Sequence, residues 1–145
     1  MRESRMSVAQ SWQQSRTAVF SAYREVSGTV ITVEGELDAA NADQLAAYVE
    51  HSVRPFGRLI LDLRGLEFIG TAGFSALHRI NVVCSGTQAH WSMAPSPVVS
   101  RLLRLCDPDG TLPVTTPAHE PLLRSAPWSQ RKELRPLLQL VPQPR

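Results

Sequence analysis

The alternation of apolar and polar residues predicts a series of short strands and helices. Residues 17–23 (TAVFSAY) and 28–37 (GTVITVEGEL) are rich in β-branched and aromatic residues, which is typical of strands. Gly28 separates them, so a hairpin is expected. In residues 39–53 (AANADQLAAYVEHSV) the apolar positions recur every three or four residues, which predicts an amphipathic helix capped by Asn41 or Asp38.

The second half of the pattern alternates strands with helices. Residues 57–63 (GRLILDL) form a nearly continuous apolar run, as expected for a strand buried on both faces. A helix follows Thr71, and residues 89–94 (AHWSMA) predict another strand. Residues 96–110 begin with Ser96 and Pro97 and end at Gly110, a pattern typical of the two ends of a helix. A last short strand is suggested at residues 112–116 (LPVTT).

This order predicts an α/β fold in which helices pack on a sheet of four or five strands. We expect one domain over residues 18–117, an N-terminal extension over 1–17, and a C-terminal tail over 118–145. The tail is rich in proline and arginine, and Pro136 interrupts its helical pattern. It either docks on the domain or is mobile; the side chains that would dock are Trp128, Leu137, Leu138 and Leu140.

Composition and charge narrow the class of function. The chain has 145 residues, of which 43% are hydrophobic and 19% charged, as in ordinary globular domains. It has no apolar run long enough to cross a membrane and no signal-peptide pattern at its start, so we expect a cytoplasmic protein. The net charge of +2 arises from the ends of the chain, because residues 18–117 hold seven Arg against ten Asp and Glu. A mildly acidic domain is a poor binder of nucleic acid.

The sequence lacks the motifs of an enzyme or a metal site. No nucleotide-binding glycine loop and no nucleophile elbow occurs, so we expect no cofactor and no catalysis. The four histidines show no metal-ligand spacing, and we interpret the acidic cluster Glu34, Glu36 and Asp38 as a solvated strand end. Cys84 and Cys106 are interpreted as small buried hydrophobic residues, with a redox contact between neighbouring helices as the alternative.

The turn Gly70-Thr71-Ala72-Gly73 is the strongest candidate site. Thr71 stands between two glycines, directly after an apolar strand and before a helix. Its hydroxyl either caps the helix or acts as a working group, and a phosphate on it would lie in the favourable field of the helix N-terminus. The glycines allow a tight turn and the close approach of another surface.

Two segments together resemble the STAS domain, the family of bacterial anti-sigma factor antagonists that also occurs in sulfate transporters. The segments are GELDAANADQL (35–45) and LILDLRGLEFIGTAGFSAL (59–77). Gly35, Glu36, Leu37 and Asp38 match the family's G-x-L-D, and Leu61, Asp62 and Leu63 match its apolar strand that ends in Asp. The turn at residues 70–74 (GTAGF) stands where the family has D-S-S-G-L. The resemblance covers roughly residues 18–116 and implies a mixed sheet with helices packed against it.

The resemblance also implies a function. Antagonists of this family bind an anti-sigma factor that is also an ATP-dependent kinase, and phosphorylation of the first Ser of D-S-S-G ends the complex. By position the phosphate acceptor is Thr71, and the partner-binding residues are Asp38, Gly70, Thr71, Ala72, Gly73 and Phe74. Gly70 replaces the family's Asp and Ala72 its second Ser, so this turn lacks a carboxylate that shapes the acceptor loop.

Three functions stay open on these residues. The first is a phosphorylation-switched anti-sigma factor antagonist. The second is an accessory subunit of an ABC-type lipid transporter, because the T-A-G at this turn also resembles STAS proteins that contact a transporter ATPase. The third is a degenerate STAS domain that binds a partner without being phosphorylated, which Gly70 favours. A homodimer is also left open.

Overall fold

A mixed five-stranded sheet forms the centre of the computed structural model, which describes residues 11–14 and 18–125. The strands follow one another in chain order: β1 (Ser11–Gln14), β2 (Ala18–Glu25), β3 (Gly28–Leu37), β4 (Arg58–Ile69) and β5 (His90–Pro95). β1, β2 and β3 pair antiparallel, whereas β3, β4 and β5 pair parallel. The α/β fold and the mixed sheet expected from the sequence are therefore confirmed.

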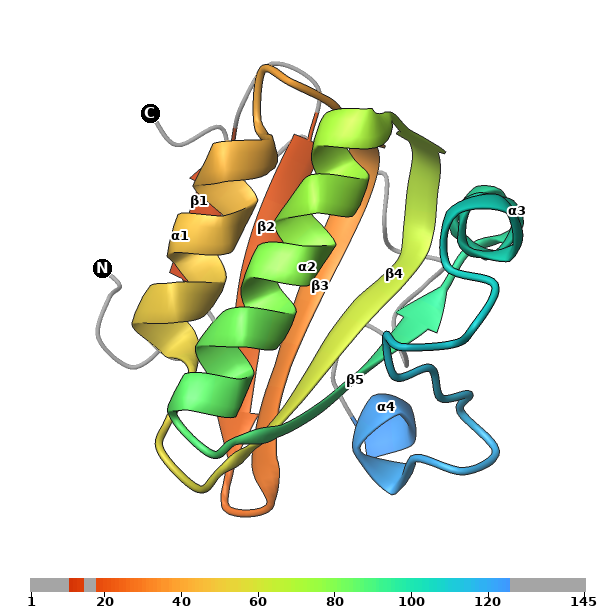
Figure 1. Cartoon of the computed structure of the whole chain (residues 1–145). Coiled ribbons are helices and arrows are strands. Elements are labelled where there is room, and N and C mark those ends of the chain that lie inside the picture. Colours follow the sequence, from red (N-terminus) through yellow and green to blue (C-terminus); the bar gives the residue numbers. More distant parts are fainter. Residues whose placement is uncertain (1–10, 15–17, 126–145) are drawn as a thin grey trace.

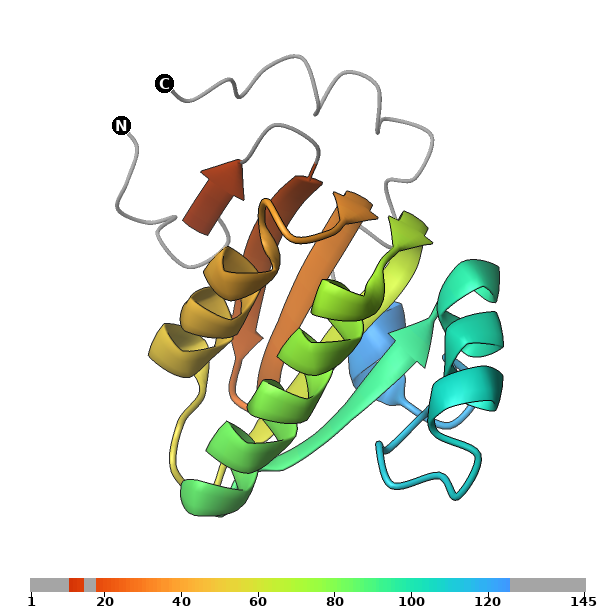
Figure 2. The ribbon, with the colours of Figure 1, turned by 45° about the horizontal axis from the view of Figure 1, so that its top comes forward.

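The helices occupy both faces of the sheet (Figure 1; Figure 2). Their bounds are α1 (Ala42–Ser52), α2 (Thr71–Gly86), α3 (Pro97–Cys106) and α4 (Pro121–Ser125). α1 and α2 lie side by side over one face, α3 lies beside β4 and β5, and α4 lies behind the sheet. Both loops that lead from a parallel strand into α1 and α2 consequently emerge at the same end of the sheet.

The predicted hairpin and the doubly buried strand are confirmed. Glu25 pairs with Gly28, which leaves a two-residue loop between β2 and β3. In β4, Leu59 and Leu61 are buried in the main core under α1 and α2, and Ile60 is buried on the opposite face. Continuous apolar sequence thus corresponds to burial on both sides.

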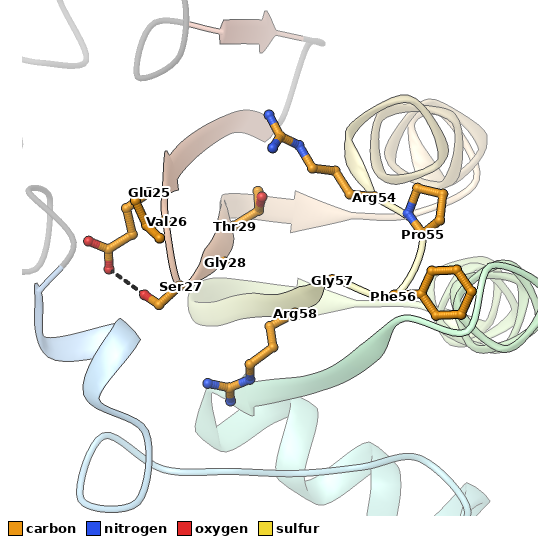
Figure 3. Close-up of a pocket in the computed structure, with 10 residues that line it drawn as sticks. All are labelled: Glu25, Val26, Ser27, Gly28, Thr29, Arg54, Pro55, Phe56, Gly57 and Arg58. Atoms are coloured by element: carbon orange, nitrogen blue, oxygen red, sulfur yellow. Dashed lines mark hydrogen bonds between the residues drawn. The ribbon is translucent and has the colours of Figure 1, made fainter.

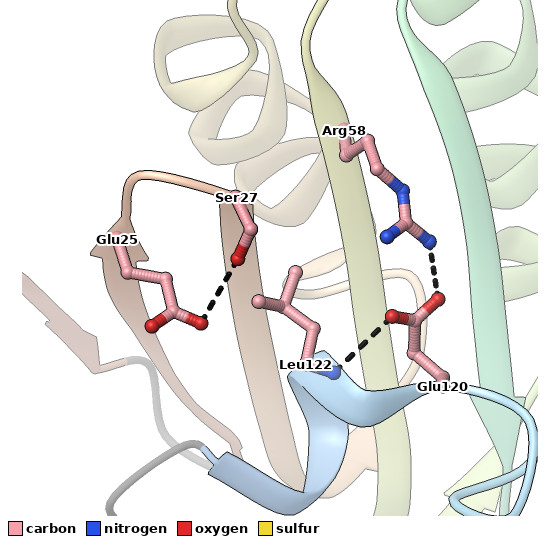
Figure 4. A network of polar contacts seen from close by, with 5 residues as sticks. All are labelled: Glu25, Ser27, Arg58, Glu120 and Leu122. Atoms are coloured by element: carbon pink, nitrogen blue, oxygen red, sulfur yellow. Dashed lines mark hydrogen bonds and ion pairs between the residues drawn. The ribbon is translucent and has the colours of Figure 1, made fainter.

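The second face of the sheet is covered by the short helix α4. Leu122 and Leu123 of α4 pack on Val30, Ile60 and Ala94. The buried carboxylate of Glu120 pairs with the guanidinium of Arg58 at the start of β4 and accepts a bond from the Leu122 N–H (3.2 Å; Figure 4). This part of the C-terminal tail is therefore docked; the predicted docking residues Trp128, Leu137, Leu138 and Leu140 lie outside the described residues.

Four details differ from the sequence expectations. The strand suggested at 112–116 is reduced to a single bridge between Met93 and Val114. α3 begins as expected, with Ser96 Oγ accepting a bond from the Val99 N–H (3.3 Å), but ends at Cys106, ahead of Gly110. The edge strand β1 and the helix α4 were not predicted, because β1 is polar and α4 has only five residues.

Candidate protein-binding site

Two loops meet at the carboxyl end of β3 and β4. We call residues 38–41 the Asp38 loop and residues 70–73 the Thr71 turn. Leu37 and Ile69, the last residues of the two strands, are neighbours in register, and the Gly70 N–H donates a hydrogen bond to the Leu37 carbonyl (2.9 Å). Parallel strands end at the same edge, so the two loops that carry the sequence-predicted residues Asp38 and Thr71 emerge at one end of the sheet (Figure 1).

The Asp38 loop is fixed by a buried asparagine. Asn41 Nδ2 donates to the Glu36 carbonyl and Asn41 Oδ1 accepts from the Asp38 N–H, both at 2.9 Å. The Asp38 carboxylate accepts from the Ala40 N–H (2.9 Å). The predicted capping of α1 is therefore wrong in detail: Asn41 occupies the N-cap position, but neither side chain bonds to the N–H groups of the helix. Both side chains instead close the loop itself.

Thr71 is not the cap of α2, contrary to one of the two expectations. It is the first helical residue, and Gly70 is the N-cap, with φ −94° and ψ −176° and no side-chain cap bond. Thr71 is exposed. The first turn of α2 contains no acidic residue, so the positive end of the helix is not neutralised by its own side chains. A phosphate on Thr71 would lie in that field.

The two glycines of the Thr71 turn serve different purposes. A Cβ on Gly73 would lie 2.6 Å from Ile69 Cγ1 and 3.1 Å from Leu37 Cδ2, so the missing side chain lets α2 pack closely on the strand ends. Gly73 is buried and offers no contact area of its own to a partner. A Cβ on Gly70 would meet only the Phe68 ring, at 3.5 Å, and its φ is one that any residue adopts. Neither the space around a Cβ nor the backbone conformation therefore requires glycine at position 70.

Among the other predicted partner-binding residues, Phe74 belongs partly to the core. Its ring is half-buried and packs edge-on against His78, with centroids 4.7 Å apart and planes at 89°. Ala72 is half-buried between Thr71 and Gly73. The surface of the predicted site thus consists of the exposed Thr71 with Asp38, Gly70, Ala72 and Phe74 around it.

Two surface residues next to this site were missed by the sequence reasoning. Phe68 is 49% exposed and Glu67 is exposed, although strict alternation would have turned one of them inward. The cause is an irregularity in the β3–β4 pairing, where Gly35 pairs with Leu66 and the next residue, Glu36, pairs with Phe68. Glu67 is the extra residue of this bulge, and bulges have no reliable signal in a single sequence.

The two cysteines differ in their exposure. Both cysteines are free. Cys84 is buried, as expected, and burial raises the pKa of its thiol to about 11. Cys106 is exposed, so its interpretation as a buried hydrophobic residue is wrong.

In residues 11–14 and 18–125, no three His, Cys, Asp or Glu side chains gather as metal ligands, and no helix is long and apolar enough to span a membrane.

Comparison with known proteins agrees with this fold. The chain is 34% identical to Osmosensory protein A of Mycobacterium tuberculosis over 91 residues, which cover 62% of this chain but only 58% of that relative. An anti-sigma factor antagonist from Mycobacterium paratuberculosis matches with a TM-score of 0.58 and 22% identity, covering 68% of this chain and 85% of the other.

An anti-sigma factor antagonist (STAS) domain protein from Planctomyces limnophilus also matches, with a TM-score of 0.58 and 20% identity over 67% of this chain and 89% of that one. At such identities the two structures show a common fold. The model of the STAS domain family matches residues 20–116, close to the range in which the sequence resembled that family. The chain therefore belongs to the STAS domain family.

Proposed function

We propose that this protein is an anti-sigma factor antagonist that captures an anti-sigma factor with a kinase-like ATPase domain. The observation that carries this proposal is that the Asp38 loop and the Thr71 turn are joined at one edge of the sheet, and that Thr71 is exposed there. The solved structures that share the fold are described as anti-sigma factor antagonists, which supports the same function. The module acts by binding, and no catalytic step is assigned to it.

Phosphorylation of Thr71 is the switch in this proposal. A phosphate adds about −1.5 to −2 charges and needs strong hydration, so it opposes burial against a partner. On the free protein the same group is stabilised by the N–H groups and the dipole at the start of α2. Modification would therefore favour the unbound protein over the complex.

A second candidate, binding without phosphorylation, is favoured by Gly70. The N-cap of α2 has no side chain, so the carboxylate that family members place beside the acceptor is missing. In that case the anti-sigma factor binds the same edge of the sheet, and Thr71 is only a contact residue. The transporter-subunit alternative stays a prediction from the sequence.

The test is to incubate the purified protein with purified candidate anti-sigma kinases and ATP, and to map phosphate by mass spectrometry. We expect binding in calorimetry and a phosphate on Thr71 that is lost in Thr71→Ala. Ser75→Ala is the matched control, because Ser75 is exposed one turn further along α2. Binding without phosphate on Thr71 would support the second candidate, and the absence of binding to every candidate would refute both.

A further inference from the structure

An exposed aromatic residue is held in a strained conformation at the end of the sheet opposite the Thr71 turn. Phe56, between α1 and β4, has φ +62° and is 74% exposed. Its N–H donates to the Thr87 carbonyl (3.1 Å), and the neighbouring Gly57 N–H donates to the Arg54 carbonyl (3.0 Å). Glycine or asparagine adopts this conformation at lower cost, so a bulky apolar residue here is unfavourable for both strain and solvation. A binding role would explain it.

Phe56 lies on one rim of a surface hollow of about 310 Å³, which we call the basal hollow. The opposite rim is the tip of the β2–β3 hairpin, where Val26 is fully exposed (Figure 3). Gly28 and Gly57 line the hollow between these two rims (Figure 3). A hollow of this size between two exposed apolar residues can accept one aromatic side chain.

The charged residues of the basal hollow are mainly basic. Arg54 is exposed, and Arg58 is 45% exposed while pairing with the buried Glu120. Arg24 lies beside them: burial and the nearby charge of Arg54 lower the pKa of its guanidinium. Glu25 is the acidic residue of the rim, and it accepts a hydrogen bond from Ser27 Oγ (3.1 Å; Figure 3; Figure 4). The hollow thus favours an acidic apolar ligand.

The other end of the same molecule carries that chemistry. Phe68 is 49% exposed at the end of β4, next to the exposed Glu67. Glu36, also exposed, is the neighbour of Phe68 in register on β3. Phe68 thus has one exposed acidic residue next to it in sequence and another next to it in register, and we call these three residues the acidic edge.

We propose that the acidic edge of one copy of this protein docks in the basal hollow of a second copy. Phe68 would enter between Val26 and Phe56, and the carboxylates of Glu36 and Glu67 would face Arg54 and Arg58. The two surfaces lie at opposite ends of one sheet, so the contact joins different patches and leaves a free patch at each end. It therefore produces head-to-tail chains, not a closed two-fold dimer, and it covers the surface beside Thr71.

The experiment uses the full chain in sedimentation velocity between about 10 µM and about 1 mM, where small interfaces associate. We expect the mean mass to rise with concentration, and association to weaken when ionic strength rises from about 0.05 M to about 0.5 M. Two variants each remove one surface. Arg54→Glu with Phe56→Asn disables the hollow and relieves the strain, and Glu67→Arg with Phe68→Ser disables the edge.

Each variant on its own should be monomeric, because the affinity of its self-association should fall by at least about tenfold. An equimolar mixture should form dimers and no longer chains, because only one working hollow and one working edge can meet. Arg101→Glu on the exposed side of α3 is the matched charge reversal and should associate like the natural protein. Thermal melting of each variant checks that it is folded.

If the natural protein stays monomeric over the whole concentration range, the proposal is overturned. That outcome includes the alternative in which the hollow binds a different acidic protein. Association that persists in both variants, or a mixture that stays monomeric, would also overturn it. Chains in the natural protein with dimers alone in the mixture would support it, because a two-fold dimer cannot give that pattern.

Discussion

The Asp38 loop and the Thr71 turn lie side by side but are held by different means. The Asp38 loop depends on side-chain hydrogen bonds around the buried Asn41. The Thr71 turn depends on close packing of Gly73 against Ile69 and on one backbone bond to Leu37. Neither arrangement uses the side chain of Thr71. The difference shows that the turn can keep its shape while Thr71 contacts a partner or accepts a phosphate.

The largest expected loss of stability comes from Asn41→Ala. It leaves the Glu36 carbonyl and the Asp38 N–H without their partner, and we expect a loss of about 2–3 kcal/mol in urea unfolding. Asn81→Ala is the matched control, because Asn81 accepts one half-buried bond, from Trp91 Nε1 (2.9 Å), and should cost only about 1 kcal/mol. Equal losses would mean that Asn41 does not fix the loop.

Gly73→Ala tests the packing of the Thr71 turn. The added Cβ would lie 2.6 Å from Ile69 Cγ1, so α2 or Ile69 must shift, and we expect a loss of about 1–3 kcal/mol in thermal or urea unfolding. In the same helix, Gly86→Ala adds a methyl group with no atom within 4 Å and should stabilise by up to about 1 kcal/mol. A neutral Gly73→Ala would show that close packing does not hold the turn.

The effect of Gly70→Asp on stability should be smaller than that of Gly73→Ala and opposite in sign. The added Cβ makes only ordinary contact with the Phe68 ring, and a carboxylate at the N-cap can accept bonds from the open N–H groups of α2. We therefore predict a gain of about 0.5–1 kcal/mol in the unfolding free energy. Gly70→Asn keeps the acceptor without the charge and separates the two contributions. A clear loss of stability in both variants would show that the turn requires glycine at this position.

Thr71→Val should have the smallest effect on stability. Thr71 is exposed and makes no side-chain cap bond, so we expect a change within about 0.5 kcal/mol in the same unfolding experiment. A loss above about 1 kcal/mol would show that the hydroxyl has a structural role after all.

The sequence predicted the elements in which hydrophobic residues recur at a regular spacing or form a long apolar run. The hairpin, the buried strand β4 and helices α1 to α3 all have such patterns, and the two loops could be placed at one edge because they follow parallel strands. The Ser96 cap was predicted because Pro97 follows it. These features depend on neighbouring residues and on general rules of α/β topology.

Features that depend on distant contacts were not predicted. α4 has only five residues, and its position depends on Arg58 and the sheet face beneath Leu122. Asn41 had the right position for a cap, but the nearby strand end offered its side chain better partners. The bulge at Glu67 and the left-handed Phe56 are likewise set by pairing with other strands and loops.

The central claim is that Thr71 lies at the surface that binds the anti-sigma factor. The most direct measurement is the affinity of one anti-sigma factor, chosen because it binds the natural protein, for Thr71→Glu and Ser75→Glu. Both variants place the same charge on the exposed side of α2, one turn apart. We predict that Thr71→Glu binds at least about tenfold more weakly while Ser75→Glu binds nearly as well as the natural protein. Undiminished binding by Thr71→Glu would contradict the account.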